Sequence, residues 1–254
     1  MTTRWLIAHF SPTGTTRKTA LAIGEGTNCP VRELDLSDPE VSGCVEADEI
    51  LLAAIPVYAG RVPAPALERL ARLRGCGQAA VAVAVYGNRH YDDALLELAQ
   101  ALAQNGFRVV AAAALIAEHS IVRTIATGRP DQADQQAARK FGAAIMHKLS
   151  QPVEEQRQIQ VPGHQPFQKP GGVPAYPKAG KTCIQCGACA KGCPVGAIPP
   201  DHPDQTDKTR CIHCMRCIAV CPQQARKVPA PVYLTLETFL KVAASTPKQP
   251  EFFL

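Results

Sequence analysis

Eight of the eleven cysteines in this 254-residue chain fall into two runs of identical spacing. Each run reads Cys-x2-Cys-x2-Cys-x3-Cys-Pro, and the second repeats the first at an offset of 28 residues. The cysteines are Cys183, Cys186, Cys189 and Cys193 in the first run and Cys211, Cys214, Cys217 and Cys221 in the second. Two-residue gaps let a tight loop present three thiolates to three corners of an iron–sulfur cubane. The spacing therefore predicts two [4Fe–4S] clusters.

This doubled run resembles that of the bacterial two-cluster ferredoxins, in which the fourth cysteine of each run ligates the other cluster. The resemblance implies one cluster on Cys183, Cys186, Cys189 and Cys221, and a second on Cys211, Cys214, Cys217 and Cys193. The alternatives are zinc and disulfides, but zinc sites usually use two separated cysteine pairs and disulfides need an oxidising compartment. His213 stands between two of the predicted ligands, and we expect it beside the cluster or facing solvent.

The composition is that of a globular protein, with 46% hydrophobic residues and no apolar run of about 18 residues that would span a membrane. The N-terminus lacks a signal-peptide pattern, so we expect a cytoplasmic protein. Residues 151–254 hold 12 Lys or Arg and 7 Asp or Glu, whereas residues 1–150 hold 15 of each. Each oxidised cluster with four thiolates carries about −2. We therefore interpret the basic charge as compensation for the clusters and expect no nucleic-acid partner.

Residues 1–150 alternate between strand-like and helix-like segments. Expected strands cover 4–10, 31–36, 49–58, 78–86 and 107–117, and expected helices cover 14–26, 65–74, 91–105 and 131–149. Three of the strands contain near-continuous apolar runs, which are typical of strands buried on both faces of a parallel sheet. The pattern predicts an α/β domain with a doubly wound, five-stranded parallel sheet.

The composition divides the remaining chain into three parts. Prolines and a Gly-Gly pair break regular structure in residues 151–176, which we interpret as a linker. Residues 177–228 hold both cysteine runs and are expected to form a small ferredoxin domain. In residues 229–254 we expect a tail with a short helix, because Leu236, Phe239, Leu240 and Ala243 recur at helical spacing. Two roles stay open for residues 251–254, which either fix the terminus or meet a partner.

The first expected strand runs into Ser11-Pro12-Thr13-Gly14-Thr15-Thr16, a hydroxyl-rich loop that opens a helix. Backbone N–H groups at a helix start form a nest for phosphate, and the Walker A and dinucleotide-binding motifs are absent. The loop resembles the flavodoxin Ser/Thr-x-Thr-Gly-x-Thr loop, although close relatives often carry Asn where Thr15 stands. The resemblance implies that Ser11, Thr13, Gly14, Thr15 and Thr16 hold the phosphate of FMN. The alternative is simple N-capping of the helix.

Two further loops follow the third and fourth expected strands, at the carboxyl ends where doubly wound sheets bind ligands. In flavodoxins, the loops at these positions sandwich the isoalloxazine ring. The resemblance implies FMN contacts from Pro56, Val57, Tyr58, Ala59, Gly60 and Arg61 in one loop and from Tyr86, Gly87, Asn88, Arg89 and Tyr91 in the other. We expect Tyr58 or Tyr91 to stack on the ring, and Arg61 or Arg89 to offset negative charge on the flavin or its phosphate.

The order of the two halves, over about residues 4–228, resembles that of flavodoxin–ferredoxin fusion proteins. It implies an electron-transfer protein that couples two clusters to FMN and serves an unidentified redox partner protein, with a homodimer as an open option. The alternative is a flavin-dependent reductase of a quinone, a nitro compound, a flavin or a corrinoid, fed by the ferredoxin domain. A redox sensor is a third hypothesis without specific support. No catalytic residue is assigned.

Overall fold

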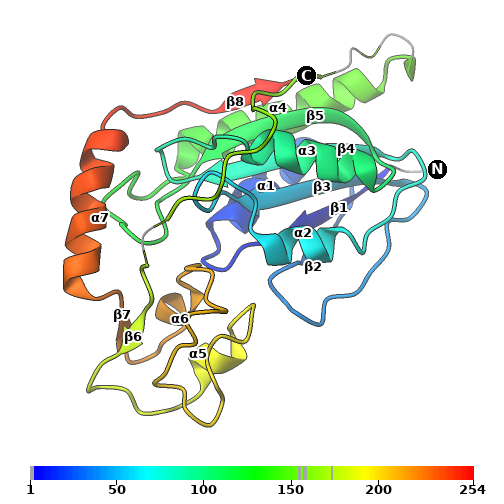
Figure 1. The fold of residues 1–254 in the computed structure, drawn as a ribbon. Coiled ribbons are helices and arrows are strands. Elements are labelled where there is room, and N and C mark those ends of the chain that lie inside the picture. Colours follow the sequence, from blue (N-terminus) through cyan, green and yellow to red (C-terminus); the bar gives the residue numbers. More distant parts are fainter. Residues whose placement is uncertain (1–2, 154–155, 157–158, 173) are drawn as a thin grey trace.

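The computed structural model describes residues 3–153, 156, 159–172 and 174–254. A six-stranded sheet forms the centre of the larger domain, in the order β2-β1-β3-β4-β5-β8 (Figure 1). The strands are β1 (Arg4–His9), β2 (Val31–Asp35), β3 (Glu49–Pro56), β4 (Ala79–Tyr86), β5 (Arg108–Ile116) and β8 (Glu251–Phe253). The first five are parallel and follow the order of flavodoxin-like doubly wound sheets. The predicted fold class is therefore confirmed.

The sixth strand corrects the prediction of a five-stranded sheet. β8 comes from the last residues of the chain and pairs antiparallel with residues 112–114 of β5. An edge strand leaves unpaired N–H and C=O groups, and β8 covers this edge of the sheet. Phe252 also packs on Phe141 of α4 (Gln132–Leu149), with ring centroids 4.8 Å apart. Three residues are too few to produce a periodic pattern, so the sequence analysis did not find this strand.

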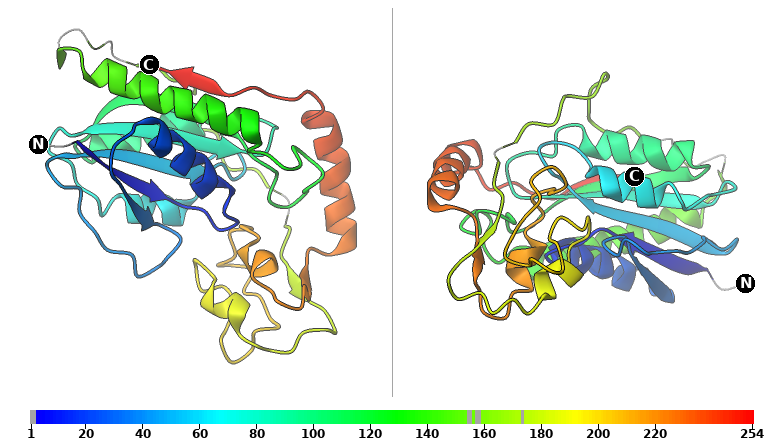
Figure 2. Two further views of the ribbon diagram at one scale, coloured as in Figure 1. Left: turned by 180° about the vertical axis from the view of Figure 1, so that it is seen from behind. Right: turned by 60° about the horizontal axis from the view of Figure 1, so that its bottom comes forward.

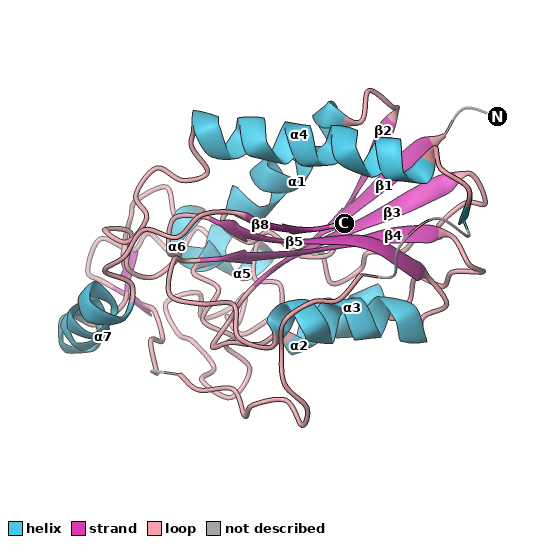
Figure 3. Cartoon of the chain, turned by 90° about the horizontal axis from the view of Figure 1, so that it is seen from above, coloured by secondary structure: helices cyan, strands magenta, loops and turns pink. Residues whose placement is uncertain are grey.

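Two layers of helices cover the sheet (Figure 3). α1 (Thr15–Gly26) and α4 lie on one face, and α2 (Ala64–Leu70) and α3 (Ala94–Gln104) lie on the other. Nearly every residue of β3 and β4 is buried, because both faces of these apolar strands pack against helices. The parallel strands all end at the same edge of the domain, where the loops that follow them gather.

The cysteine runs form a small domain beside this edge (Figure 2). It contains two short helices, α5 (Ala188–Lys191) and α6 (Arg216–Ala219), and an antiparallel pair of strands, β6 (Lys178–Ala179) and β7 (Arg226–Lys227). α7 (Ala230–Ala243) follows and packs Leu236 and Leu240 against the loop after β5. The chain then returns to the sheet as β8. Residues 229–254 thus connect the small domain back to the large one.

The predicted linker is attached to the α/β domain along part of its length. Asp93 is completely buried and accepts hydrogen bonds from the backbone N–H groups of His164 at 2.9 Å and Gln168 at 2.8 Å. Arg61 donates to the carbonyl of Gln168 at 2.7 Å and lies over the ring of Phe167. Linker residues 154, 155, 157, 158 and 173 lie outside the described residues. No helix in the described ranges is both long enough and apolar enough to cross a membrane.

Candidate redox site

The eight cysteines of the two runs separate into two groups of four, each lining a small cavity. The outer group is Cys183, Cys186, Cys189 and Cys221, and the inner group is Cys193, Cys211, Cys214 and Cys217. Each group takes three cysteines from one run and the fourth from the other. The structure thus brings together the same two sets of four that the resemblance to two-cluster ferredoxins implies.

The two runs fold into the same local turn. Gln185 and Gly187 in the first run, and His213 and Met215 in the second, have φ angles of 53°, 74°, 56° and 62°. These left-handed residues curl the backbone between successive cysteines, so that the thiols of one run converge. A one-turn helix starts directly after Gly187 and after Met215. The 28-residue sequence repeat is therefore also a structural repeat.

Two members of the inner group, Cys214 and Cys217, are buried, and the thiols of the group influence one another. Burial raises the pKa of Cys214 to about 12 and that of Cys217 to about 11, and the neighbouring thiols add to both shifts. Cys193 contributes to the raised pKa of the three other members, as expected if the four thiols converge. Thiols in such surroundings ionise when a metal coordinates them. Four convergent sulfur donors, none of them exposed, fit an iron–sulfur cluster.

The outer group lies closer to solvent. Cys186 is exposed, and Ile184 exposes 62% of its surface. Burial alone would raise the pKa of Cys221, but hydrogen bonds from backbone N–H groups, including that of Ala225, outweigh it and lower the pKa. N–H groups directed at a sulfur also stabilise a thiolate that ligates iron. The outer group is therefore the more accessible of the two candidate cluster sites.

A third cavity, of about 540 Å³, opens at the carboxyl ends of β3, β4 and β5. This volume lies within the range of small-molecule and cofactor pockets. We call it the flavin cavity, after the cofactor that the sequence analysis predicts at this edge. Seven of the residues predicted to contact the flavin line it: Val57, Tyr58, Ala59, Gly60, Tyr86, Gly87 and Arg89. The predicted contacts Pro56, Arg61, Asn88 and Tyr91 are not among the described residues that line it.

The loop after β3 is a two-residue hairpin turn. Tyr58 and Arg61 exchange backbone hydrogen bonds of 2.9 and 3.1 Å, and Ala59 and Gly60 between them have φ angles of 53° and 83°. Two successive positive φ angles are typical of a type I′ turn, which favours glycine. Burial raises the pKa of the Tyr58 hydroxyl well above its usual value. Tyr58 lines the flavin cavity and packs against the hydrophobic core of the α/β domain, as Ile212 of the small domain also does.

The loop after β5 contributes His119, which the sequence analysis did not single out. Burial lowers the pKa of His119 to about 4, and the positive charge of Arg89 adds to this shift. Its Nδ1 accepts hydrogen bonds from the backbone N–H groups of Ile121 and Val122 at 3.2 and 3.0 Å. The proton of the neutral ring is therefore on Nε2. A side chain at Gly87 would approach His119 Cδ2 to 2.5 Å, so glycine is needed where β4 ends.

Two predicted flavin contacts instead hold the C-terminal segment. The Nδ2 group of Asn88 donates to the carbonyls of Ala244 at 2.9 Å and Thr246 at 3.1 Å. Its Oδ1 accepts from the backbone N–H of Lys248 at 2.8 Å. Tyr91 is buried and donates its hydroxyl proton to Glu251 of β8 at 3.0 Å. These side chains therefore fix the course of the chain from α7 to β8.

Arg61 is also engaged outside the lining of the flavin cavity. Its guanidinium forms an ion pair with Glu97 of α3 at 2.5 Å, and Glu97 also accepts from the backbone N–H of Val62 at 2.9 Å. This pairing, led by the hydrogen bond to Glu97, raises the pKa of Arg61. Arg89 also forms an ion pair, with Asp92, but of the two arginines predicted to offset charge on a flavin it is the one that lines the cavity.

The other walls of the flavin cavity come from residues that the sequence analysis did not name as flavin contacts. They comprise His90, Asp92, Ser120 and Ile121 of the strand loops, Gln168, Lys169, Gly171 and Gly172 of the linker, Ile212 and His213 of the small domain, and Leu236, Phe239 and Leu240 of α7. The switch-point rule contained a signal for the loop after β5, because this strand also ends at the binding edge. No local pattern identifies the residues of the linker or of α7.

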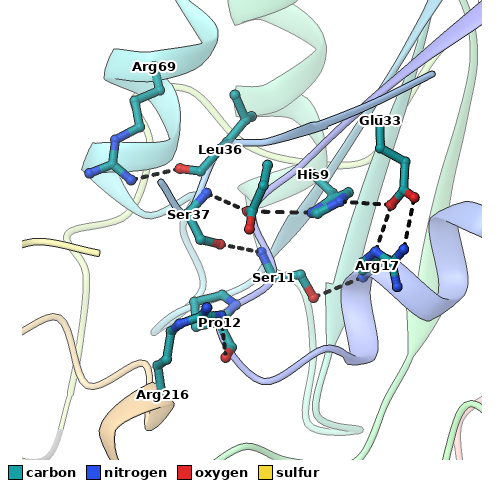
Figure 4. Close-up of polar contacts among 10 residues, drawn as sticks. His9, Ser11, Pro12, Arg17, Glu33, Leu36, Ser37, Arg69 and Arg216 are labelled. Atoms are coloured by element: carbon teal, nitrogen blue, oxygen red, sulfur yellow. Dashed lines mark hydrogen bonds and ion pairs between the residues drawn. The ribbon is translucent and has the colours of Figure 1, made fainter. Parts of the chain in front are cut away.

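The predicted phosphate loop joins β1 to α1 (Figure 4). Gly14 has a φ angle of 91°, and Ser11 Oγ accepts a hydrogen bond from the N–H of Arg17 in the first turn of α1. The alternative interpretation of the loop was N-capping, but the N-cap residue of α1 is Gly14, which has no side-chain cap, and Ser11 satisfies this one N–H group from three residues before Gly14. None of the described residues accepts a hydrogen bond from the N–H groups of Thr13, Thr15 and Thr16. Free N–H groups at a helix start suit a phosphate.

The small domain contacts the α/β domain next to these sites. Arg216 of α6 donates to the carbonyl of Pro12 in the phosphate loop at 3.2 Å (Figure 4). Arg69 of α2 donates to the carbonyl of Pro194, which follows the inner-group residue Cys193. Ile212 lines both the inner-group cavity and the flavin cavity. His213 lines the flavin cavity, and its Nε2 is buried without a partner among the described residues.

Residues 145–226 match the family model of the 4Fe-4S dicluster domain. No curated protein matches the chain at a significant level. Solved structures with a similar fold are an archaeal flavodoxin (18% identity, TM-score 0.44, covering 58% of this chain and 99% of that chain), a WrbA-like flavodoxin from Agrobacterium tumefaciens (16%, 0.43, 57% and 96%) and oxidised flavodoxin 2 from Bacillus cereus (16%, 0.40, 57% and 99%). The strand order of the sheet, rather than these similarities, identifies the fold.

The chain thus joins a flavodoxin-like α/β domain to a 4Fe-4S dicluster domain, as flavodoxin–ferredoxin fusion proteins do. The α/β domain suggests a flavin, and the dicluster domain supports iron–sulfur clusters. Together they suggest electron transfer.

Proposed function

We propose that this chain is an electron-transfer protein that holds two [4Fe–4S] clusters and one FMN and lets electrons pass between them. The observation that carries the proposal is that Ile212 lines both the inner-group cavity and the flavin cavity. Tyr58 supports it, because Tyr58 and Ile212 both line the flavin cavity and both pack against the hydrophobic core of the α/β domain. The two candidate cofactor sites are therefore neighbours within one chain.

When bound, the clusters would supply one-electron chemistry and FMN would supply both one- and two-electron chemistry. The residues of the chain have separate tasks in this proposal. The eight cysteines of the outer and inner groups hold the clusters, and the N–H groups of Thr13, Thr15 and Thr16 hold the phosphate. Tyr58, Ala59, Gly87 and Arg89 enclose the ring, and Leu236 and Leu240 of α7 limit the access of water to it.

The accessibility of the sites suggests their order. Cys186 of the outer group is exposed, whereas Cys214 and Cys217 of the inner group are buried. A redox partner protein would therefore exchange electrons at the outer group, and the inner group would stand between it and the flavin cavity. Lys181, just before the first cysteine run, and Lys191, within it, are both exposed. A partner with an acidic surface would therefore be favoured.

Cofactor analysis of the anaerobically reconstituted chain tests this proposal. We expect about eight iron atoms, about eight sulfides and one FMN per chain. Cys186→Ser and Cys214→Ser should each lose or alter one cluster, whereas Cys76→Ser, at an exposed cysteine outside both runs, should alter none. The proposal fails if the wild-type chain binds no FMN, or if bound FMN stays oxidised while both clusters are reduced.

A second function, a flavin-dependent reductase of a small acceptor, is favoured by the apolar side of the flavin cavity. Phe239 of α7 lines this cavity and is 56% exposed, so a planar apolar molecule could enter beside the flavin there. Turnover with a panel of quinones, nitro compounds, free flavins and corrinoids tests it. Phe239→Ala should change KM, whereas Val242→Ala, an exposed α7 residue outside the cavity lining, should not. Absence of turnover with the whole panel would favour the electron carrier.

A further inference from the structure

Arg226 of β7 is a buried cation beside the outer group of cysteines. It exposes only 1% of its surface, and its Nη1 lies 3.8 Å from the Sγ of Cys189 in the outer group. Arg226 also lines the outer-group cavity, and Cys189 packs against Cys217 of the inner group. The guanidinium therefore lies at the point where the two cysteine groups meet.

The hydrogen-bond partners of Arg226 are all uncharged. The guanidinium donates to the carbonyls of Pro203 at 2.6 Å, Pro177 at 3.2 Å and Gln205 at 3.3 Å, and to the hydroxyl of Thr206. Its buried Nε has no partner among the residues that the structure describes. A buried charge is costly unless an opposite charge and hydrogen bonds compensate it. Two anionic clusters would provide that charge, and their sulfur atoms would provide an acceptor.

The internal repeat allows Arg226 to be compared with the residue at the equivalent position of the first half. Twenty-eight residues before Arg226, at the equivalent position of the first run, the chain carries Ile198. Ile198 is buried and packs with Cys189 and Cys217. The two halves share their cysteines, turns and helices, yet one places an apolar side chain at this position and the other a cation. Since isoleucine can fill this position, packing alone does not account for an arginine.

We propose that Arg226 raises the reduction potentials of both clusters and so stabilises an electron on each. This inference rests on the proposed binding of two clusters. Reduction adds negative charge to a cluster, and reduction potentials depend on nearby charge and on hydrogen bonds to the sulfur atoms. Because Arg226 contacts Cys189, which packs against Cys217 of the inner group, it offsets part of the repulsion between electrons on the two clusters. A chain that can hold two electrons at once is suited to a two-electron flavin.

Anaerobic potentiometric titration followed by EPR spectroscopy tests this proposal. Arg226→Ile, which introduces the residue found in the other half, should make reduction of each cluster at least tenfold less favourable, or about 59 mV more negative for a one-electron couple. Lys227→Gln removes an exposed charge from the next residue and should leave both potentials nearly unchanged. Unchanged potentials in Arg226→Ile with full iron and sulfide content would overturn the proposal.

Arg226→Lys decides the question if Arg226→Ile fails to assemble its clusters. Lysine keeps the charge but loses the Nε–H donor and the fork of the guanidinium. In Arg226→Lys we expect reduction potentials below those of the wild type and above those of any Arg226→Ile protein that binds its clusters. Wild-type potentials in an Arg226→Lys protein with full iron and sulfide content would overturn the proposed contact between the guanidinium and the clusters. Iron and sulfide content of the wild type separates this inference from the proposed function, because absent clusters would refute the latter before any potential is compared.

Discussion

Replacing Asn88 with alanine is expected to release the C-terminal segment from the α/β domain. The buried side-chain amide makes three hydrogen bonds to the backbone of Ala244, Thr246 and Lys248. At about 1 kcal/mol for each bond, their loss lowers the free energy of unfolding by about 3 kcal/mol. Asn88 also has a φ angle of 63°, where alanine costs about 1 kcal/mol more. The variant should therefore lose about 4 kcal/mol in all.

Asn28 offers a matched control, because it is exposed and has a φ angle of 55°. Asn28→Ala carries a similar backbone cost but removes no hydrogen bond to the C-terminal segment. In urea titrations, we expect Asn88→Ala to lose about 3 kcal/mol more than Asn28→Ala. Hydrogen exchange should accelerate in α7 and β8 of the Asn88 variant only. Equal stability losses in the two variants, with unchanged exchange in α7 and β8, would refute the anchoring role of Asn88.

Three further predictions concern the flavin cavity and β8. Burial lowers the pKa of His119 from 6.5 to about 4, so the unfolded chain binds a proton on this imidazole more tightly than the folded chain does. About 3 kcal/mol of the free energy of unfolding is therefore lost as the pH falls from 6.5 to 4. In urea titrations, His119→Gln should flatten the pH dependence of stability, and an unchanged slope would contradict the burial of His119. Gly87→Ala should displace His119 and weaken FMN binding at least tenfold, as measured by a flavin fluorescence titration. Gly171→Ala is the control, because Gly171 lines the same cavity and an added methyl group there would contact no neighbouring atom, so this variant should bind FMN as the wild type does. Tyr91→Phe should cost about 2 kcal/mol by losing its bond to Glu251, and the same change in a Glu251→Ala background should cost much less; equal costs would argue against this contact.

The parallel sheet could be predicted because its signals are local. The apolar runs of β3, β4 and β5 indicate strands buried on both faces, and the structure buries nearly all of their residues. β8 could not be predicted in the same way, because it is short and its stability comes from pairing with β5, more than 130 residues earlier in the sequence. Pairing between such distant segments leaves no periodic pattern.

The two cysteine groups could be predicted for a similar reason. The ligand spacing is set within each run, and the exchange of Cys193 and Cys221 follows from a rule about paired runs. The flavin cavity could be predicted only in part. The loops after β3 and β4 lie at the expected edge, but the linker, Ile212 and α7 complete the cavity through tertiary contacts. Asn88 and Tyr91 could equally serve a ring or a distant segment, and only the fold shows which.

The central claim is that electrons pass between the inner-group cluster and FMN within one chain. Anaerobic stopped-flow reduction of the reconstituted chain by a small excess of low-potential donor tests this claim most directly. We expect FMN to be reduced after the clusters, at a rate that does not depend on protein concentration, and we expect this phase to be lost in Cys214→Ser and kept in Cys76→Ser. A phase that scales with protein concentration, or one that is equally fast in Cys214→Ser, would contradict the claim.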